Sequence, residues 1–235
     1  MLKKIEIDPV KGKERWVAHL DILGASKLIE SKHWSQVFSV YAESLEKFRR
    51  EAFDEHLIDR FAFSDSFILY TVDQTAISYR ALDSFVRRFV VSLIQREIPI
   101  RGAMSCGYFY ADSENDLFFG QALLEAYRVG ESQDWVGFVL CESAVAQLDR
   151  VGLPANERLN YGLWSVPFKS KEPPREILTC RLPTFIIGAG PSETGQKPCR
   201  DALLRMQAGA KTDEVRRKYA NTLAFLDENV RNVVA

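Results

Sequence analysis

The sequence is poor in the residues that bind zinc or form disulfides. It has four cysteines and three histidines, and no two cysteines form a C-x-x-C pair. This spacing argues against a zinc site and against a disulfide framework, and it favours reduced thiols in a cytoplasmic protein. The cysteines are Cys106, Cys141, Cys180 and Cys199, and the histidines are His19, His33 and His56.

Long hydrophobic runs and an excess of charge are also absent. No stretch approaches the ~20 apolar residues that cross a bilayer, so we expect no membrane span. The N-terminus lacks the apolar core of a signal peptide. The net charge is −1, which predicts no basic surface for nucleic acid. With 46% hydrophobic residues, the chain can bury one large core, alone or with an appendage.

Hydrophobic periodicity predicts alternating strands and helices. The elements are expected as a strand at 14–23, a helical region at 25–52, a hairpin at 57–63 and 66–72, a helix at 74–97, a strand at 100–110, a polar loop at 111–117, a helix at 118–131, a strand at 135–141 and a helix at 142–149. The order β-α-β-β-α-β predicts an α+β, ferredoxin-like fold with a mostly antiparallel sheet. With helices on one face, such a sheet would leave its other face free for a ligand or a second subunit.

The last part of the chain is less regular. Strands are expected at 163–168 and 177–182, on either side of a turn rich in lysine and proline. A Gly/Pro/Ser-rich connection then leads into an amphipathic helical segment at 199–230, with a break near Gly209. We therefore predict a catalytic domain over 1–182, with a linker and a helical extension over 183–235 that packs on it.

Two acidic residues stand where strands end. Asp21 closes a largely apolar run, Val17–Leu23, and Ser26 can cap the helix that follows. Asp65 stands at the tip of an aromatic-rich hairpin. A buried carboxylate is costly without a positive partner, and two of them beside a helix start would suit divalent metal ions on a triphosphate. The alternative is that Asp21 caps the helix and Asp65 is a turn residue.

Five short motifs follow one another in a fixed order between residues 14 and 180. They are Leu20–Ser26, Phe63–Asp65, Ile100-Arg101 with Gly107, Gly120 with Arg128 eight residues later, and the turn Lys169–Lys171. In this order and spacing they resemble the class III nucleotidyl cyclases. The resemblance implies an enzyme that cyclises a nucleoside triphosphate and releases pyrophosphate.

The resemblance also implies a metal and phosphate site. Asp21, Asp65 and the carbonyl of Ile22 would bind two divalent metal ions, Mn²⁺ or Mg²⁺. The phosphates would meet four consecutive backbone N–H groups, those of Leu23, Gly24, Ala25 and Ser26.

Two basic residues complete the implied site. Arg128 would stabilise charge on the α-phosphate, unless it is a solvated helix arginine. Lys171 would bind the outer phosphates, unless it is an exposed turn lysine. In the resembled fold the acids and the arginine come from opposite subunits, which implies a homodimer with two shared sites.

Three positions depart from the family pattern. Phe61 replaces the lysine that reads a purine, Leu117 replaces its Asp or Thr partner, and Leu124 replaces the asparagine that positions the ribose. These changes make the chain most similar to the pyrimidine cyclases of the Pycsar anti-phage systems. The resemblance implies cyclic UMP made from UTP, with cyclic CMP as a close alternative, and a separate effector protein that senses it.

The residues that would read the base are less defined. Phe61 could stack on a pyrimidine, and Arg101 could donate to a uracil oxygen. For Arg101, a structural ion pair is the preferred interpretation. For the whole chain, the rival interpretations are a catalytically inactive nucleotide-binding or dimerisation module, a cyclase of other base specificity such as an adenylate cyclase, and a diguanylate-type or polymerase palm.

Overall fold

The computed structural model describes residues 8–24, 35, 38–39, 42–43, 46, 56–153, 160–169, 173–182 and 193–234. Most of the helical region predicted for 25–52 therefore lies outside the described residues. Ala25, Ser26 and Lys171, three of the predicted site residues, also lie outside them.

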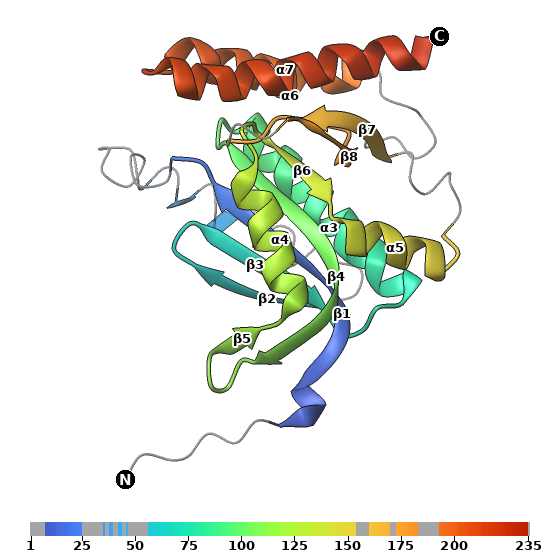
Figure 1. Cartoon of the computed structure of the whole chain (residues 1–235). Coiled ribbons are helices and arrows are strands. Elements are labelled where there is room, and N and C mark those ends of the chain that lie inside the picture. Colours follow the sequence, from blue (N-terminus) through green and yellow to red (C-terminus); the bar gives the residue numbers. More distant parts are fainter. Residues whose placement is uncertain are drawn as a thin grey trace.

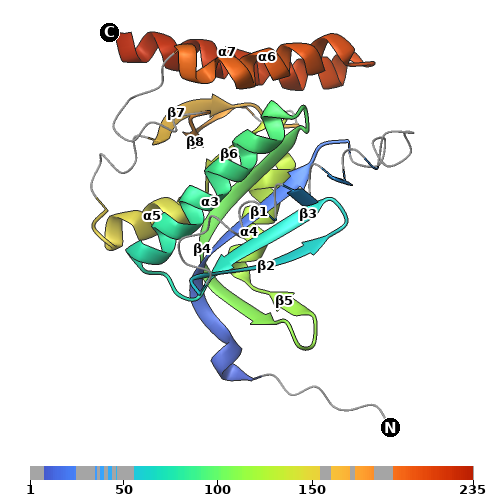
Figure 2. The same cartoon turned by 180° about the vertical axis from the view of Figure 1, so that it is seen from behind.

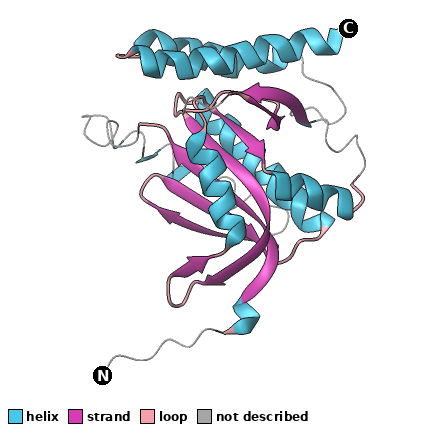
Figure 3. Cartoon of the chain, viewed as in Figure 1, coloured by secondary structure: helices cyan, strands magenta, loops and turns pink. Residues whose placement is uncertain are grey.

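Eight strands of the described chain form one sheet, in the order β2-β3-β1-β4-β6-β8-β7, with β5 paired to β4 (Figure 1, Figure 3). They are β1 (Gly12–Ile22), β2 (Ile58–Phe63), β3 (Ser66–Thr71), β4 (Ile100–Asp112), β5 (Leu117–Phe119), β6 (Gly137–Leu140), β7 (Tyr161–Val166) and β8 (Arg175–Cys180). The β4–β6 pair is parallel and the other pairs are antiparallel. This arrangement confirms the predicted α+β fold with a mostly antiparallel sheet.

The strand β1 lies at the centre of the sheet and its side chains alternate between the two faces. Trp16 belongs to the main core, where its ring lies 4.9 Å from that of Tyr79 on α3 (Ala76–Gln95). His19 points to the opposite face, where its ring meets that of Tyr127 edge-on at 5.2 Å. Asp21, two residues later in the strand, shares the face of His19.

The helices lie on both faces of the sheet, so the expectation of one free face is wrong. α3 and α5 (Glu142–Arg150) cover one face, and α4 (Gln121–Ser132) crosses β1 and β4 on the other (Figure 1, Figure 2). Small residues allow this close packing: Ala122, Ala126 and Gly130 recur at four-residue steps and are buried. A Cβ on Gly130 would lie 3.4 Å from the Cα of Gly102 in β4.

The C-terminal helices α6 (Glu193–Gly209) and α7 (Asp213–Val234) lie side by side beyond one end of the sheet (Figure 1). Cys199, Leu203 and Phe225 belong to the same hydrophobic core as β1 and α3. The break after Gly209 is at the predicted place, although α6 begins six residues earlier than expected. None of the described helices is both long enough and apolar enough to cross a membrane.

The short strand β5 was not predicted, because its residues were assigned to a polar loop and to the start of a helix. It forms because Phe119 stacks on Tyr110 of β4, with ring centroids 4.9 Å apart. The same two residues, Tyr110 and Phe119, lie opposite each other in the antiparallel β4–β5 pair. A cross-strand aromatic pair of this kind stabilises a hairpin that three residues alone would not form.

Candidate active site

The two predicted metal-binding acids are neighbours in the structure. The β1–β3 register places Asp21 opposite Ser66, whose hydroxyl donates to Asp21 Oδ1 at 3.4 Å. Asp65 precedes Ser66 in the hairpin turn, and its carbonyl accepts from the N–H of Ile22 at 3.0 Å. Ser64 adopts a positive φ of 56°, which closes the two-residue turn. Asp21 and Ser66, 45 positions apart in the chain, therefore meet at one end of the sheet.

Arg101 binds the first of these acids from the adjacent strand. Its Nη2 lies 3.0 Å from Asp21 Oδ2 and also donates to the carboxylate of Glu131 at the end of α4. Its Nη1 donates to the carbonyls of Glu131 and Gln133 at 3.0 and 3.3 Å. Arg101 is 4% exposed. It forms the structural ion pair that we preferred, and its position does not support the base contact proposed from the sequence.

Glu131 is a site residue that the sequence analysis missed. Its carboxylate lies beside Asp21, bound to the same guanidinium nitrogen, and 3.6 Å from Lys169 Nζ. A signal for it existed: Arg101 faces Asp21 in the β1–β4 register, and a buried arginine needs more than one acceptor. The pairing of β1 with β4 must be known before that signal can be used.

Burial and crowding set the charge state of this cluster. Burial and the Glu131 carboxylate together raise the pKa of Asp21 to about 6, although the Arg101 guanidinium opposes both. Burial alone would raise the pKa of Glu131 too, but Arg101 and a hydrogen bond from Asp21 bring it below its ordinary value. Asp21 and Glu131 thus share the guanidinium of Arg101, and Lys169 Nζ lies 3.6 Å from Glu131. The raised pKa of Asp21 means that its ionised form is poorly compensated here, and an added cation would stabilise it.

The donor set fits Mg²⁺ or Mn²⁺ when other ligands complete it. Across the described ranges, no group of three or more Asp, Glu, Cys or His side chains is arranged to hold a metal ion alone. Magnesium usually keeps several waters and uses one or two carboxylates together with substrate phosphates. Asp21 and Asp65 would supply these two carboxylates, and Ile22, next to Asp21 in β1, donates its N–H to the carbonyl of Asp65.

The predicted phosphate-binding turn is described in part. The N–H of Leu23 donates to the carbonyl of Pro99 at 2.8 Å, so the role predicted for this amide is corrected. Gly24 has a φ of 74°, and a Cβ there would meet nothing within 4 Å. This left-handed, open turn favours glycine and leaves space for a ligand.

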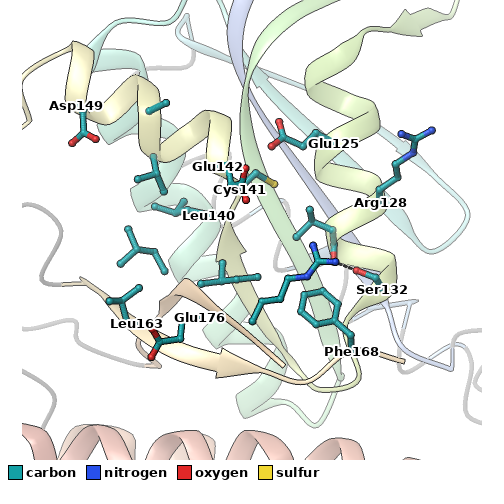
Figure 4. Close-up of a pocket in the computed structure, with 16 residues that line it drawn as sticks. Glu125, Arg128, Ser132, Leu140, Cys141, Glu142, Asp149, Leu163, Phe168 and Glu176 are labelled. Carbon is teal, nitrogen blue, oxygen red and sulfur yellow. Dashed lines mark hydrogen bonds between the residues drawn. The ribbon is translucent and has the colours of Figure 1, made fainter. Parts of the chain in front are cut away.

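Arg128 points away from the sheet. It lies on the side of α4 opposite Ala122 and Ala126, and it is exposed. Among the described residues it has no hydrogen-bond or ion-pair partner. With Glu125 and Ser132 it lines a cavity of about 890 Å³ between α4, α5 and the β7–β8 pair (Figure 4). The structure therefore does not bring Arg128 into contact with Asp21 or Asp65 of the same chain.

The positions that depart from the family pattern all carry apolar side chains. The ring of Phe61 already stacks on that of Phe118, with centroids 4.5 Å apart and 26° between the planes. Leu117, next to Phe118 in β5, is half-buried, and Leu124 on α4 is exposed. None of these side chains can form a hydrogen bond with a base.

Solved cyclase domains share this architecture. The catalytic core of a rhodopsin-guanylyl cyclase with converted specificity, in complex with ATPαS, aligns with a TM-score of 0.50 and 13% identity, over 72% of this chain and 97% of that chain. An adenylate cyclase from Trypanosoma brucei aligns with a TM-score of 0.52 and 9% identity, over 76% and 93%. This chain has the class III nucleotidyl cyclase fold. A double mutant of the guanylyl cyclase domain of the RhoGC fusion protein from the fungus Blastocladiella emersonii gives 0.51 and 11%, over 72% and 96%. No family model and no curated protein matches the sequence.

Proposed function

We propose that this protein is a nucleotidyl cyclase that converts a pyrimidine nucleoside triphosphate, UTP foremost, into a 3′,5′-cyclic nucleotide and pyrophosphate. One observation carries the proposal: Asp21 and Asp65 are adjacent at the end of the central strand of a cyclase fold. An inactive nucleotide-binding or dimerisation module would not need two acids at one point, one of them, Asp21, destabilised by burial.

In this reaction the ribose 3′-oxygen attacks the α-phosphorus and pyrophosphate leaves. Mg²⁺ or Mn²⁺, when bound, would lower the pKa of the 3′-hydroxyl and neutralise the leaving phosphates. Asp21 and Asp65 would hold these ions, and Arg101 keeps the Asp21 carboxylate in one orientation. Such catalysis consists mainly of positioning and charge stabilisation.

Arg128 would act in a second protomer. Its side chain is exposed, lacks a partner in the described part of the chain, and lies beside exposed apolar residues on the same helix, Leu124 and Tyr127. Phe63, at the tip of the hairpin that carries Asp65, is 73% exposed. Exposed apolar side chains of this kind are typical of an interaction surface, and a homodimer would cover them. It would also bring Arg128 of each protomer to the acids of the other.

The preference for a pyrimidine rests on what the base site lacks. Phe61, Leu117 and Leu124 offer no hydrogen bonds, and the guanidinium of Arg101 is bound by acids and carbonyls. A smaller base beside the Phe61–Phe118 pair fits this apolar surface.

We further propose that cyclic UMP is a signal in antiviral defence, sensed by a separate effector. The cysteines suit a reducing cytoplasm, since all four are buried free thiols and burial raises the pKa of Cys199 to about 12.

The proposal is tested by incubating the protein with Mn²⁺ and each of four nucleoside triphosphates, followed by mass spectrometry. Cyclic UMP as the main product would support it. Preferential formation of cyclic AMP or cyclic GMP would support cyclase activity but contradict the proposed preference for a pyrimidine. Absence of every cyclic mononucleotide would favour the inactive module, and a linear or dinucleotide product would favour a palm-type enzyme.

A further inference from the structure

Residues 131–136 run from the end of α4 to the start of β6 and contact the candidate active site. The carbonyls of Glu131 and Gln133 accept hydrogen bonds from Arg101 at 3.0 and 3.3 Å. Arg101 in turn holds the carboxylate of Asp21 at 3.0 Å. The orientation of Asp21 therefore depends on where the backbone of this 131–136 segment lies.

Three side chains of α7 bind the same segment. The hydroxyl of Thr222 lies 2.9 Å from both the nitrogen and the carbonyl oxygen of Val136. Asn221 donates to the carbonyl of Asp134 at 2.8 Å, and Arg217 Nε lies 2.8 Å from the Asp134 carboxylate. The backbone of the 131–136 segment is thus fixed by α7 at Asp134 and at Val136.

Buried contacts connect the two ends of the segment. The side-chain nitrogen Nε2 of Gln133 donates to the carbonyl of Gly102, next to Arg101 in β4, at 3.1 Å. The side-chain oxygen Oε1 of Gln133 accepts a hydrogen bond from the Trp135 indole at 2.7 Å. The Trp135 ring meets Phe225 of α7 at 5.3 Å and 75°. Gln133 and Trp135 are completely buried. In a close-packed interior, displacement at one end of such a chain shifts the other end.

We propose that α7 positions the carboxylate of Asp21 for metal binding. Thr222 and Asn221 hold the 131–136 segment, the segment holds Arg101, and Arg101 holds Asp21. Thr222 and Asn221 are positioning residues, since they hydrogen-bond to the segment and not to the acids. This assigns a role to the C-terminal extension, which the cyclase resemblance does not cover. The inference rests on the proposed function for the metal-binding role of Asp21.

The first test is amide hydrogen exchange of the full chain. Thr222→Val keeps the shape of the side chain but removes both hydrogen bonds to Val136. We expect exchange to accelerate roughly tenfold in the 131–136 segment and at the amides of Ile22 and Leu23, which donate to Asp65 and Pro99. Thr222→Ser retains the hydroxyl and should restore wild-type exchange.

The matched control is Thr179→Val. Thr179 is also completely buried, and its hydroxyl donates to a backbone carbonyl, that of Ile177, at 3.0 Å. This bond lies within β8 and outside the path to Arg101. Unchanged exchange at Ile22 and Leu23 in Thr222→Val would overturn the inference, and so would equal acceleration in both valine variants.

The second test follows the Mn²⁺ concentration that gives half-maximal cyclase activity. In Thr222→Val we expect this concentration to rise roughly three- to tenfold, with Thr222→Ser near wild type and Thr179→Val unchanged. An unchanged value in Thr222→Val would count against positioning. If the wild-type protein makes no cyclic nucleotide, the proposed function fails, and the exchange experiment alone decides whether α7 controls the Asp21 end of β1.

A surface variant covers the case in which Thr222→Val does not fold. Arg217→Ala removes an ion pair to Asp134 from a side chain that is 58% exposed. Arg216→Ala is its control, because Arg216 binds Asp213 and the carbonyl of Ala210 within the extension itself. Acceleration of exchange in the 131–136 segment by the first variant alone supports the inference, and equal behaviour of the two overturns it.

Discussion

At the scale of single residues, Asp21 shows how strongly a side chain depends on its neighbours. A carboxylate in this buried place would be expensive alone, and Arg101 makes it tolerable by reaching it from the adjacent strand. Glu131 binds the same guanidinium and also lies 3.6 Å from Lys169 Nζ. Arg101 therefore stabilises the fold and holds Asp21 in one orientation.

Replacing Arg101 should be costly for stability. Arg101→Gln leaves Asp21 and Glu131 without their shared cation, and we expect the free energy of unfolding to fall by about 3–5 kcal/mol. Arg205→Gln is the control, because Arg205 forms an exposed pair with Glu97 at 2.7 Å and should contribute below about 1 kcal/mol. Urea unfolding of both variants measures the difference. Equal losses would show that the Arg101 pair is no stronger than a surface pair.

Asp65 should matter for activity and little for stability. Its side chain is half-buried and has no hydrogen-bond partner among the described residues, so Asp65→Asn should leave the melting temperature within a few degrees. Cyclic nucleotide formation should fall about 100-fold or more, because one metal carboxylate is lost. Asp116→Asn, in the β4–β5 turn, is the matched control and should retain activity. Wild-type turnover by Asp65→Asn would show that Asp65 is not part of the active site.

At the scale of elements, the sequence was informative where a pattern repeats. β1, the β2–β3 hairpin and α3 follow hydrophobic alternation or three- and four-residue spacing, and their bounds lie within two residues of the predicted ones. β5 was missed because three residues are too few to show a hydrophobic periodicity, and the strand depends on the stacking of Phe119 on Tyr110. The side of the sheet that α4 covers was also missed, because helix periodicity does not say which strands a helix will cross.

Packing between β1 and β4 should tolerate no side chain at Gly102. A Cβ there would lie 2.3 Å from the carbonyl oxygen of His19, a rigid backbone atom. We expect Gly102→Ala to lower the free energy of unfolding by about 1–3 kcal/mol. Gly130→Ala should change it by less than about 1 kcal/mol, because its Cβ would make ordinary contact at 3.4 Å and helices favour alanine. Thermal unfolding compares the two, and similar values would refute the clash.

At the scale of the whole molecule, the candidate site depends on contacts that no local pattern encodes. Arg101 lies 80 positions from Asp21 and 30 from Glu131. Thr222 lies 86 positions from Val136. The two acids were predicted from their places at strand ends and from the resemblance. Their partners follow only from strand register and from the docking of α4 and α7.

Shared active sites predict complementation between inactive chains. Asp65→Asn loses a metal-binding acid, and Arg128→Ala loses the arginine that would act on the α-phosphate. A mixed dimer therefore regains one site with both groups intact. After unfolding and refolding together, the mixture should recover about a quarter of wild-type activity, because half of randomly formed dimers are mixed and each has one of two sites. A mixture of Asp65→Asn with Asp21→Asn should recover none. Failure of the first mixture would argue against shared sites.

The shared core of the C-terminal helices has a practical consequence for recombinant work. Phe225 packs against Trp135 and Trp164, and Cys199 and Leu203 of α6 are completely buried. A fragment cut after residue 182 would lack Phe225, Cys199 and Leu203 and would uncover the two tryptophan rings. We expect such a fragment to precipitate during expression, so that a search for a minimal catalytic unit should keep residues 193–234 in the gene.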